Sequence, residues 1–442
     1  MGITNTPYRL FGHLVFLLLL VSCGGGGGST TTTTTYTVGG VVYGLASPGT
    51  VTLTNGAQSL TTSGGSFSAS STLVAQSTYT IAVAQQPAKS VTCAGGSGTV
   101  VSNNVTNLLV YCEPTPLAST VAVSTFSGNY PNLGQFDSTL LTSLYRNPTG
   151  LALNTLATLL YVADTGNNAI RKIDVINSAV TTLIGPTSGA TAAGYATGTK
   201  NSVRFSNPTA VAVDASGNIY VADAGNFLIR LFDSSGLETI GFAGSPQVAG
   251  TSDGAGTAAR FTNPTDLAID VSGNIYVCDN NLIRKITATG TVSTWVNLGV
   301  GVLATGVAVD RLGYVYVATS THLIKRISSD ATVSNLAGSG IAATTDGLST
   351  AAAFNTPTRL AVDAYSNVFV SESAGMSIRM IKPDGTVLTF AGTGAISIPP
   401  VDSATGTLAT FNTPMGLAIT SAGQLYVADK ANNIIRLLAA PY

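Results

Sequence analysis

A short sequence unit recurs six times in the second part of the chain, and this repetition constrains the fold more than any other feature. Each copy opens with a run ending in Leu-Ala or Val-Ala, at residues 147–152, 207–212, 263–268, 303–308, 356–361 and 413–418. A second run, mostly of the form Ile-Tyr-Val-Ala-Asp, recurs at residues 160–164, 219–223, 275–279, 315–319, 368–372 and 425–429. A third run places Arg or Lys after isoleucine, at residues 170–171, 229–230, 283–284, 324–325, 378–379 and 435–436. Alternation of side-chain character within these runs predicts short antiparallel strands.

A fourth strand completes each unit, as in Thr386-Val-Leu-Thr-Phe. It follows the third run in five copies, but after Arg436 only six residues remain. The missing copy stands ahead of the first unit, at Thr120–Gly128. We therefore expect the last sheet to take its outer strand from the start of the repeats, which closes a ring and leaves no open edge between its ends.

The repeated unit resembles the NHL repeat, and the resemblance covers residues 117–442. It implies an all-β protein whose main body is a six-bladed β-propeller. Some NHL propellers bind RNA, but this chain has a formal net charge of -1, with Lys and Arg scattered singly or in pairs. Binding of nucleic acid requires a basic surface, so we exclude it as a function.

The N-terminus has the pattern of an export signal. Arg9 precedes an apolar run, Leu14–Val21, that is too short to span a bilayer. The run ends in Leu20-Val-Ser-Cys23, which resembles the lipobox of bacterial lipoproteins. The resemblance implies a signal peptide at residues 1–22 and a lipid on Cys23, whereas the alternative is an ordinary secretory signal with an incidental cysteine.

Residues 23–35 comprise Cys23 and a run of Gly, Ser and Thr, which is typical of a flexible tether. Gly24 stands where Asp would indicate retention in the inner membrane. We therefore expect a protein of the cell envelope, held to the outer membrane by its lipid anchor and either periplasmic or exposed at the surface.

A small β-domain is expected at residues 36–113, where short alternating stretches are separated by turn signals such as Asn55-Gly56. It resembles the Ig-like β-sandwich of bacterial envelope proteins. Cys93 and Cys112 fall within it, and an oxidising compartment would pair them as a disulfide. Cys278 replaces an alanine of the repeat, so we interpret it as a small buried apolar residue.

We assign a structural role to the repeated Asp and Arg. Residues that recur across the units are expected to form charge-assisted hydrogen bonds that hold turns and strands together. The alternative is a ring of catalytic charges. A ligand site must break the symmetry of the repeat. Asp266 and Arg359 do so, because each replaces a small residue at the start of an inner strand, near the mouth of the central channel.

Three further departures lie on the same predicted face. Thr319 and Glu372 replace the repeated Asp, and His322 stands where Asn168, Asn281 and Asn433 stand in other copies. The connection before the fourth blade, Leu298–Val302, is also much shorter than its counterparts. This short connection predicts a gap before the fourth blade in the ring of long loops that covers this face.

Six-bladed propellers of similar sequence include lactonases and peptide-amidating lyases that use a metal or several histidines. After removal of the signal, this chain retains one histidine, His322, which excludes a zinc site of three imidazoles. Calcium held by carboxylates and carbonyls stays open. We expect a non-catalytic binding or scaffolding module for an unidentified protein, peptide or glycan. The alternatives are a calcium-dependent hydrolase or lactonase with its site at the channel mouth, and a purely structural spacer.

Overall fold

The computed structural model describes most of the chain from residue 36 onward, namely residues 36–43, 51–55, 58–62, 65–73, 78–85, 91–94, 96–99, 105–114, 121–187 and 193–439. The predicted signal peptide, Cys23 and the tether lie outside these residues. Among the residues described, no helix is long and apolar enough to span a bilayer. The helices that occur there are single 3₁₀ turns, at Thr165–Asn167, Lys200–Ser202, Ala224–Asn226, Ser349–Ala351, Gly406–Leu408 and Lys430–Asn432.

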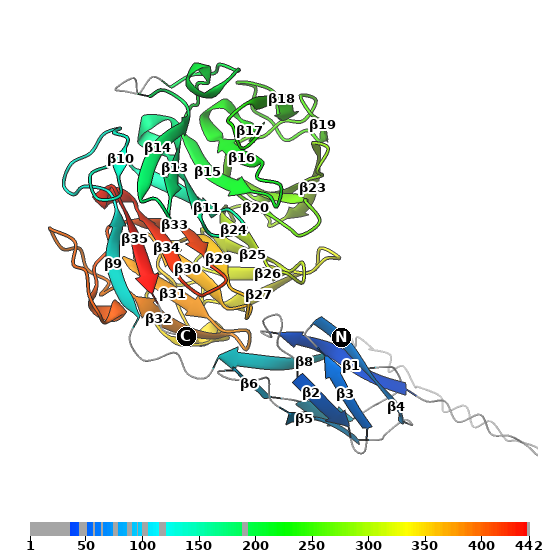
Figure 1. The fold of residues 1–442 in the computed structure, drawn as a ribbon. Helices are drawn as coiled ribbons and strands as arrows, with labels where there is room; N and C mark the ends of the chain where they lie inside the picture. Colours follow the sequence, from blue (N-terminus) through cyan, green and yellow to red (C-terminus); the bar gives the residue numbers. More distant parts are fainter. Residues whose placement is uncertain are drawn as a thin grey trace, which may run out of the picture.

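Residues 121–439 form a six-bladed propeller, with each blade an antiparallel sheet (Figure 1). From the axis outward, blade 1 is β11 (Pro148–Leu153), β12 (Leu159–Asp164), β13 (Ala169–Asp174) and β14 (Ala179–Ile184). Blade 2 is β15 (Pro208–Val213), β16 (Ile219–Asp223), β17 (Leu228–Phe232) and β18 (Glu238–Ala243). Blade 3 is β20 (Pro264–Ile269), β21 (Ile275–Asp279), β22 (Leu282–Ile286) and β23 (Thr291–Asn297).

The remaining three blades follow the same order. Blade 4 is β24 (Ala304–Val309), β25 (Val315–Thr319), β26 (Ile324–Ile327) and β27 (Val333–Ala337). Blade 5 is β29 (Pro357–Val362), β30 (Val368–Glu372), β31 (Ser377–Ile381) and β32 (Thr386–Ala391). Blade 6 is β33 (Pro414–Ile419), β34 (Leu425–Asp429), β35 (Ile434–Ala439) and β9 (Ala122–Ser127).

The ring closes as the sequence predicts. The strand β9 is the first of the propeller in the chain and the outermost of its last blade, where it pairs antiparallel with β35. Val123 lies opposite Leu438, and Thr125 lies opposite Arg436. The two ends of the propeller are therefore joined by main-chain hydrogen bonds, and blade 6 cannot separate from blade 1 without breaking this ladder.

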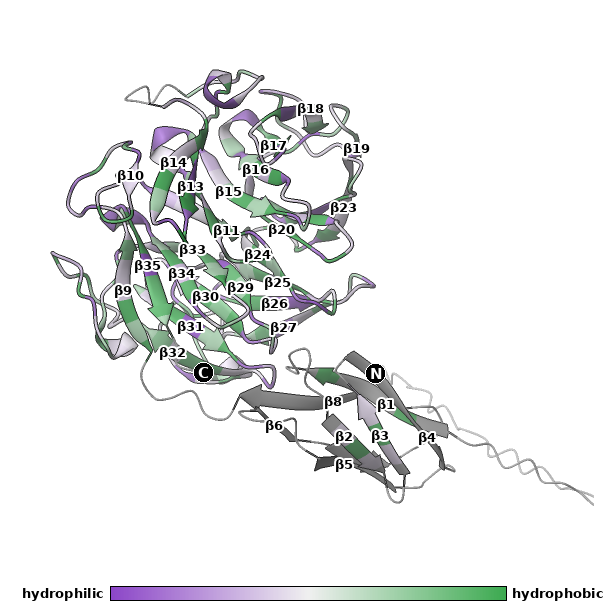
Figure 2. Cartoon of the chain, in the orientation of Figure 1, coloured by the Kyte–Doolittle hydropathy of each residue, from purple (hydrophilic) through white to green (hydrophobic). Residues whose placement is uncertain are grey.

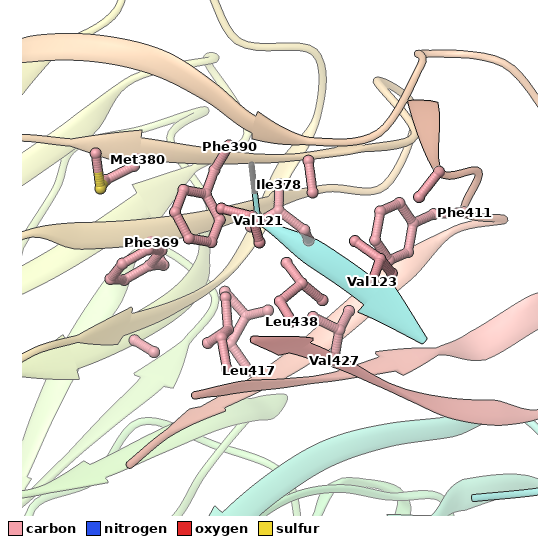
Figure 3. Packing of buried hydrophobic residues seen from close by; sticks show 14 residues of the cluster. Val121, Val123, Phe369, Ile378, Met380, Phe390, Phe411, Leu417, Val427 and Leu438 are labelled. Atoms are coloured by element: carbon pink, nitrogen blue, oxygen red, sulfur yellow. The ribbon is translucent and has the colours of Figure 1, made fainter. Parts of the chain in front are cut away.

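The strands of the blades are rich in hydrophobic residues (green in Figure 2), and their buried side chains form clusters between neighbouring blades, which is where the core lies. Between blades 5 and 6, the rings of Phe369, Phe390 and Phe411 pack with Val123 and Leu438 (Figure 3). Phe369 and Phe390 meet edge to face, with ring centroids 5.0 Å apart. Burial of each such side chain contributes roughly 1.5–3 kcal/mol, so β9 is held by packing as well as by its hydrogen bonds.

The strands described between residues 36 and 114 form two further sheets. One has the order β4 (Gly65–Leu73), β1 (Tyr36–Tyr43), β8 (Val105–Pro114) and β6 (Val91–Ala94). The other has the order β3 (Gln58–Thr62), β2 (Val51–Asn55), β5 (Thr78–Gln85) and β7 (Gly96–Thr99). The similarity to an Ig-like domain stays a prediction. The backbones of β6 and β8 place Cys93 opposite Cys112. Their side chains lie outside the described part of the structure, so the disulfide also stays a prediction.

Candidate functional site

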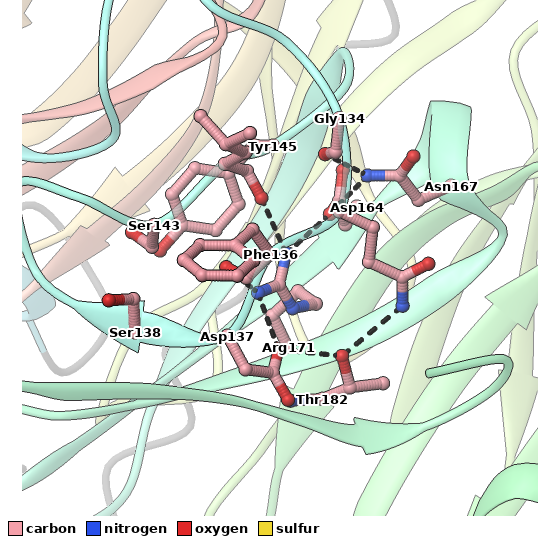
Figure 4. A network of polar contacts seen from close by, with 12 residues as sticks. Gly134, Phe136, Asp137, Ser138, Ser143, Tyr145, Asp164, Asn167, Arg171 and Thr182 are labelled. Atoms are coloured by element: carbon pink, nitrogen blue, oxygen red, sulfur yellow. Dashed lines mark hydrogen bonds and ion pairs between the residues drawn. The ribbon is translucent and has the colours of Figure 1, made fainter. Parts of the chain in front are cut away.

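The repeated Asp and Arg form a buried ion pair on the face that carries the long loops (Figure 4). We call this ion pair, together with its hydrogen-bond partners, the staple of a blade. Arg171 is completely buried and donates from Nη1 to Asp164 Oδ2 at 3.0 Å and to the carbonyl of Leu144 at 2.7 Å. Its Nη2 donates to Asp137 Oδ1 at 2.8 Å and to the carbonyl of Phe136 at 3.0 Å. One guanidinium thus ties the second strand of blade 1 to the loop that precedes the blade, which confirms a structural role.

The same staple recurs with Arg230, Arg284, Arg379 and Arg436, which pair with Asp223, Asp279, Glu372 and Asp429. In each of these blades and in blade 1, the guanidinium stacks on an aromatic ring of the preceding loop, for example Arg436 on Phe411 at 5.2 Å. Burial raises the pKa of Asp223 to about 6, although Arg230 opposes this effect. In these five blades, the aromatic residue before the inner strand is therefore packed against the buried arginine and has a structural role.

Glu372 takes the place of the Asp in blade 5. Its carboxylate accepts hydrogen bonds from Arg379 at 3.2 Å and from the Asn355 N–H at 2.7 Å, so it belongs to the staple. The extra methylene is accommodated by Gly375, which stands where the staples of blades 1, 2 and 6 have an Asn such as Asn167. A Cβ on Gly375 would lie 2.8 Å from Glu372 Oε2. Glu372 is therefore a structural substitute and is completely buried.

Thr319 and His322 are also engaged in the fold of blade 4. Thr319 is completely buried, and its Oγ1 donates to the Leu323 carbonyl at 2.9 Å. His322 has a φ of 61°, and its Nδ1 accepts a hydrogen bond from the Thr356 N–H at 3.3 Å. Asn168 makes the same link to the N–H of Asn207, at 2.9 Å. The imidazole nitrogen of His322 thus ties blade 4 to blade 5, in place of the Asn Oδ1 that accepts the equivalent hydrogen bond from Asn207.

One alignment from the sequence is wrong. The sequence predicts that His322 corresponds to Asn281, but the left-handed residue of blade 3 is Asn280, with a φ of 56°. The turn in blade 3 has only Asn280 and Asn281 between β21 and β22, so the left-handed position moves one residue towards the N-terminus. Counting back from the third strand could not reveal this shift, because it depends on the length of the turn.

Asp266 and Arg359 do meet at the centre of the ring. Arg359 Nε lies 3.5 Å from Asp266 Oδ1, and the other carboxylate oxygen accepts a hydrogen bond from the Val307 N–H at 2.9 Å. Arg359 also donates to the carbonyls of Thr265 and Thr305 on two neighbouring inner strands. Burial raises the pKa of Asp266, while the Arg359 guanidinium opposes that shift.

These two residues lie at one end of a central channel of about 300 Å³. They follow the long loops, at the third position of β20 and β29. The inner strands approach closely at this level, since a Cβ on Gly306 would lie 2.1 Å from the Thr358 carbonyl. At the other end of the strands the lining side chains are apolar and half-buried, namely those of Leu153, Val213, Ile269, Val309 and Ile419. The channel thus has one polar end and one apolar end.

The sequence did not reveal the main-chain part of this site. Arg359 is held mainly by carbonyl oxygens, which every residue has, so no pattern of side chains indicates them. Within the residues that the structure describes, no three His, Cys, Asp or Glu side chains lie close enough together to hold a metal ion. Cys278 is completely buried with a free thiol, and burial raises its pKa well above the usual value.

The fold and the repeated staple define the chain as a six-bladed β-propeller that carries an NHL repeat. The sequence model of the NHL repeat matches residues 205–232, which contain β15, β16 and β17 of blade 2. The protein SUPPRESSOR OF QUENCHING 1, chloroplastic, of Arabidopsis thaliana is 28% identical over 319 residues, which is 68% of this chain and 26% of that protein. Human NHL repeat-containing protein 2 is 28% identical over 333 residues, with coverages of 70% and 41%. The chain thus spans less than half the length of either relative.

Solved structures share the fold over most of the chain. A protein of unknown function from Bacteroides thetaiotaomicron has a TM-score of 0.60 at 17% identity, and 89% of this chain and 91% of that chain are covered. An auxiliary nutrient binding protein from Bacteroides ovatus has a TM-score of 0.57 at 16% identity, with the same coverages. At these identities the similarity establishes the fold alone.

Proposed function

We propose that this protein is a non-catalytic binding module of the cell envelope and that its ligand enters the central channel. The observation that carries the proposal is the arrangement of Asp266 and Arg359. Their charges are directed at each other and at main-chain groups of the inner strands. They therefore serve to close one end of the channel, and the rest of its lining is made of glycine, alanine and larger apolar residues together with main-chain groups of the inner strands, which can accept a small ligand.

The size of the channel supports this proposal. Small-molecule sites in proteins have volumes of about 300–1,000 Å³, with mainly apolar walls and a few placed polar groups. The channel, at about 300 Å³, fits an apolar group of a nutrient, peptide or glycan, and not a whole large ligand. Two similar folds from Bacteroides are described as auxiliary nutrient binding proteins, which is consistent with uptake of a ligand at an envelope.

A variant that fills the channel tests the proposal. Val309→Trp places an indole at the apolar end, and Ile240→Trp is the matched control, because Ile240 is 65% exposed on the outer strand β18. Each protein is incubated with small molecules extracted from bacterial envelopes, and the masses of the protein and its complexes are measured by native mass spectrometry. We expect a bound species in the wild type and in Ile240→Trp, reduced about tenfold or more in Val309→Trp.

Equal binding by the two tryptophan variants would contradict a site in the channel. Thermal unfolding of each variant checks that the blades remain intact. The protein could instead convert a component of the extract into a product of different mass. If this conversion requires calcium and is lost in Asp266→Ala, the result would favour the calcium-dependent hydrolase or lactonase. The two functions therefore give different masses in the same measurement.

A further inference from the structure

The outer edges of five blades are covered by part of a loop between blades. Short strands pair with the outer strands of blades 1, 3 and 5, namely β10 (Ser138–Thr139), β19 (Gly254–Ala255) and β28 (Gly347–Leu348). Isolated main-chain bridges do the same in blade 2, between Thr199 and Leu237, and in blade 6, between Ser403 and Val123. We call these pieces of chain cover segments. Each one satisfies main-chain groups that would otherwise form an open sheet edge.

Four cover segments use the same chemistry. An Asp precedes the paired residue and accepts hydrogen bonds from the staple arginine and from a threonine of the outer strand. Asp402 does so with Arg436 at 2.6 Å, with the Thr125 N–H at 2.9 Å and with Thr125 Oγ1 at 3.1 Å. The equivalent carboxylates in blades 1, 3 and 5 are those of Asp137, Asp253 and Asp346. In blade 2 the acid comes from the outer strand itself, as Glu238.

Blade 4 has no such cover segment among the residues described, because only Leu298–Leu303 connects β23 to β24. Its outer strand β27 is the end of its sheet. The side chain of Val333 provides a direct comparison. Val333 is 39% exposed, whereas the valines at the same register of the covered blades 1, 3, 5 and 6 are at most 2% exposed, namely Val180, Val292, Val387 and Val123.

The groups that hold an Asp elsewhere have counterparts at this edge. Lys325 stands at the position of the staple arginine and lies opposite Asn335, which stands at the position of the threonine. Lys325 Nζ donates to Asn335 Oδ1 at 2.9 Å, and no acidic partner for Lys325 is found in the described chain. Arg326 is the next residue of β26 and stacks on Tyr314 at 5.1 Å. The edge therefore combines unpaired main-chain groups with positive charge.

We propose that the β27 edge of blade 4 is a docking site for an extended acidic segment of a partner protein. The segment adds to β27 as a short strand opposite Val333 and places a carboxylate against Lys325 and the N–H of Asn335. The five covered blades supply the template for this geometry. A second copy of this chain fits less well, because two β27 edges would bring Lys325 and Arg326 of both copies together without an acid.

A peptide copied from the protein's own cover segment is a direct probe. Residues 250–257, Gly-Thr-Ser-Asp-Gly-Ala-Gly-Thr, are synthesised with a fluorescent label and titrated against the full chain by fluorescence anisotropy. The matched control peptide has Asn in place of the Asp. We expect the Asp peptide to bind about tenfold more tightly, as a charge-assisted hydrogen bond of this kind predicts.

Variants of the protein locate the site. Lys325→Glu should weaken binding of the Asp peptide by about tenfold, while Lys172→Glu, on the third strand of covered blade 1, should leave it unchanged. The double change Lys325→Arg with Asn335→Thr restores the residues of the covered blades and should tighten binding roughly threefold or more. Misfolding could weaken binding of the peptide but could not tighten it. The tighter binding therefore distinguishes a direct contact with the peptide from an effect of lost stability.

Equal binding of the two peptides, or full binding by Lys325→Glu, would overturn the proposal. Dimerisation of the chain that Asn335→Pro abolishes would also overturn it, since a second copy would then occupy the edge. This site is separate from the channel. Val309→Trp, which tests the proposed function, should therefore bind the Asp peptide normally, and the failure of one proposal leaves the other standing.

Discussion

The buried carboxylate of each staple shows how one side chain can serve several parts of a blade. In blade 1, Asp164 Oδ1 accepts the Arg146 N–H, while Oδ2 accepts from both Asn167 and Arg171. Removing one partner of such a buried pair typically costs about 3–5 kcal/mol, because the other charge is left without compensation. Blade 5 keeps the function of this group with different residues, Glu372 and Gly375.

That exchange can be tested by a double-mutant cycle. Glu372→Asp shortens the carboxylate beside Gly375, and Gly375→Asn forces a side chain against Glu372 Cβ and Oε2, both at 2.8 Å from the site of its Cβ. Each single change should lower the free energy of unfolding by about 1–3 kcal/mol. The double variant recreates the pair found in blade 1 and should lose less than the sum, with a coupling of at least about 1 kcal/mol. Urea denaturation measures all three, and additive losses would contradict the exchange.

The candidate residues show what sequence can and cannot reveal at this scale. Asp266, Thr319, His322, Arg359 and Glu372 all break the repeat, and the structure places them in two different settings. Only Asp266 and Arg359 line the channel. Thr319, His322 and Glu372 keep the hydrogen bonds of the residues they replace or make local substitutes for them. A departure in residue type does not report whether a hydrogen-bonding role has been lost, so sequence alone could not separate the two groups.

The closing strand is the element on which the ring depends. β9 contributes main-chain pairs to β35, a hydrogen bond to Asp402 from Thr125 and the buried side chain of Val123 to the core. Deleting residues 120–128 should therefore destabilise the whole propeller and lower its melting temperature by several degrees or more. Adding a synthetic peptide of residues 119–129 should recover part of the loss, because the deleted strand binds to a preformed edge. Calorimetry with and without the peptide measures both effects.

An unchanged melting temperature after the deletion would contradict this account of closure. The strand itself could be predicted, because six inner runs and only five following outer runs leave one outer strand to be found elsewhere. The cover strands β10, β19 and β28 could not. Each has two residues, which is too short for any periodic pattern, and their pairing depends on a loop folding back over its own blade. The short connection before blade 4 was predicted, but its consequence for the β27 edge required these pairings.

On the scale of the whole molecule, the symmetry of the ring determines where specific binding can occur. The five staples repeat the same contacts, so they stabilise the blades without distinguishing one from another. Two departures affect larger features. Asp266 and Arg359 lie together at one end of the axis that all six blades share, and within the described part of the chain blade 4 lacks the cover segment of the others. We therefore propose two sites in this propeller, one for a small ligand on its axis and one for a protein segment at its rim.

The proposed location of the molecule rests on Cys23. If the cysteine carries the lipid, Cys23→Ala should move the protein from the membrane to the soluble fraction, because each buried CH₂ of an acyl chain contributes about 0.8 kcal/mol to anchoring. Ser22→Ala, next to it, should leave the protein with the membrane, so it controls for general effects on export. Fractionation followed by immunoblotting measures the distribution. A Cys23→Ala protein that still sediments with membranes would show that something other than the lipid holds it there. The proposal that residues 23–35 tether the protein to a lipid anchor would then be wrong.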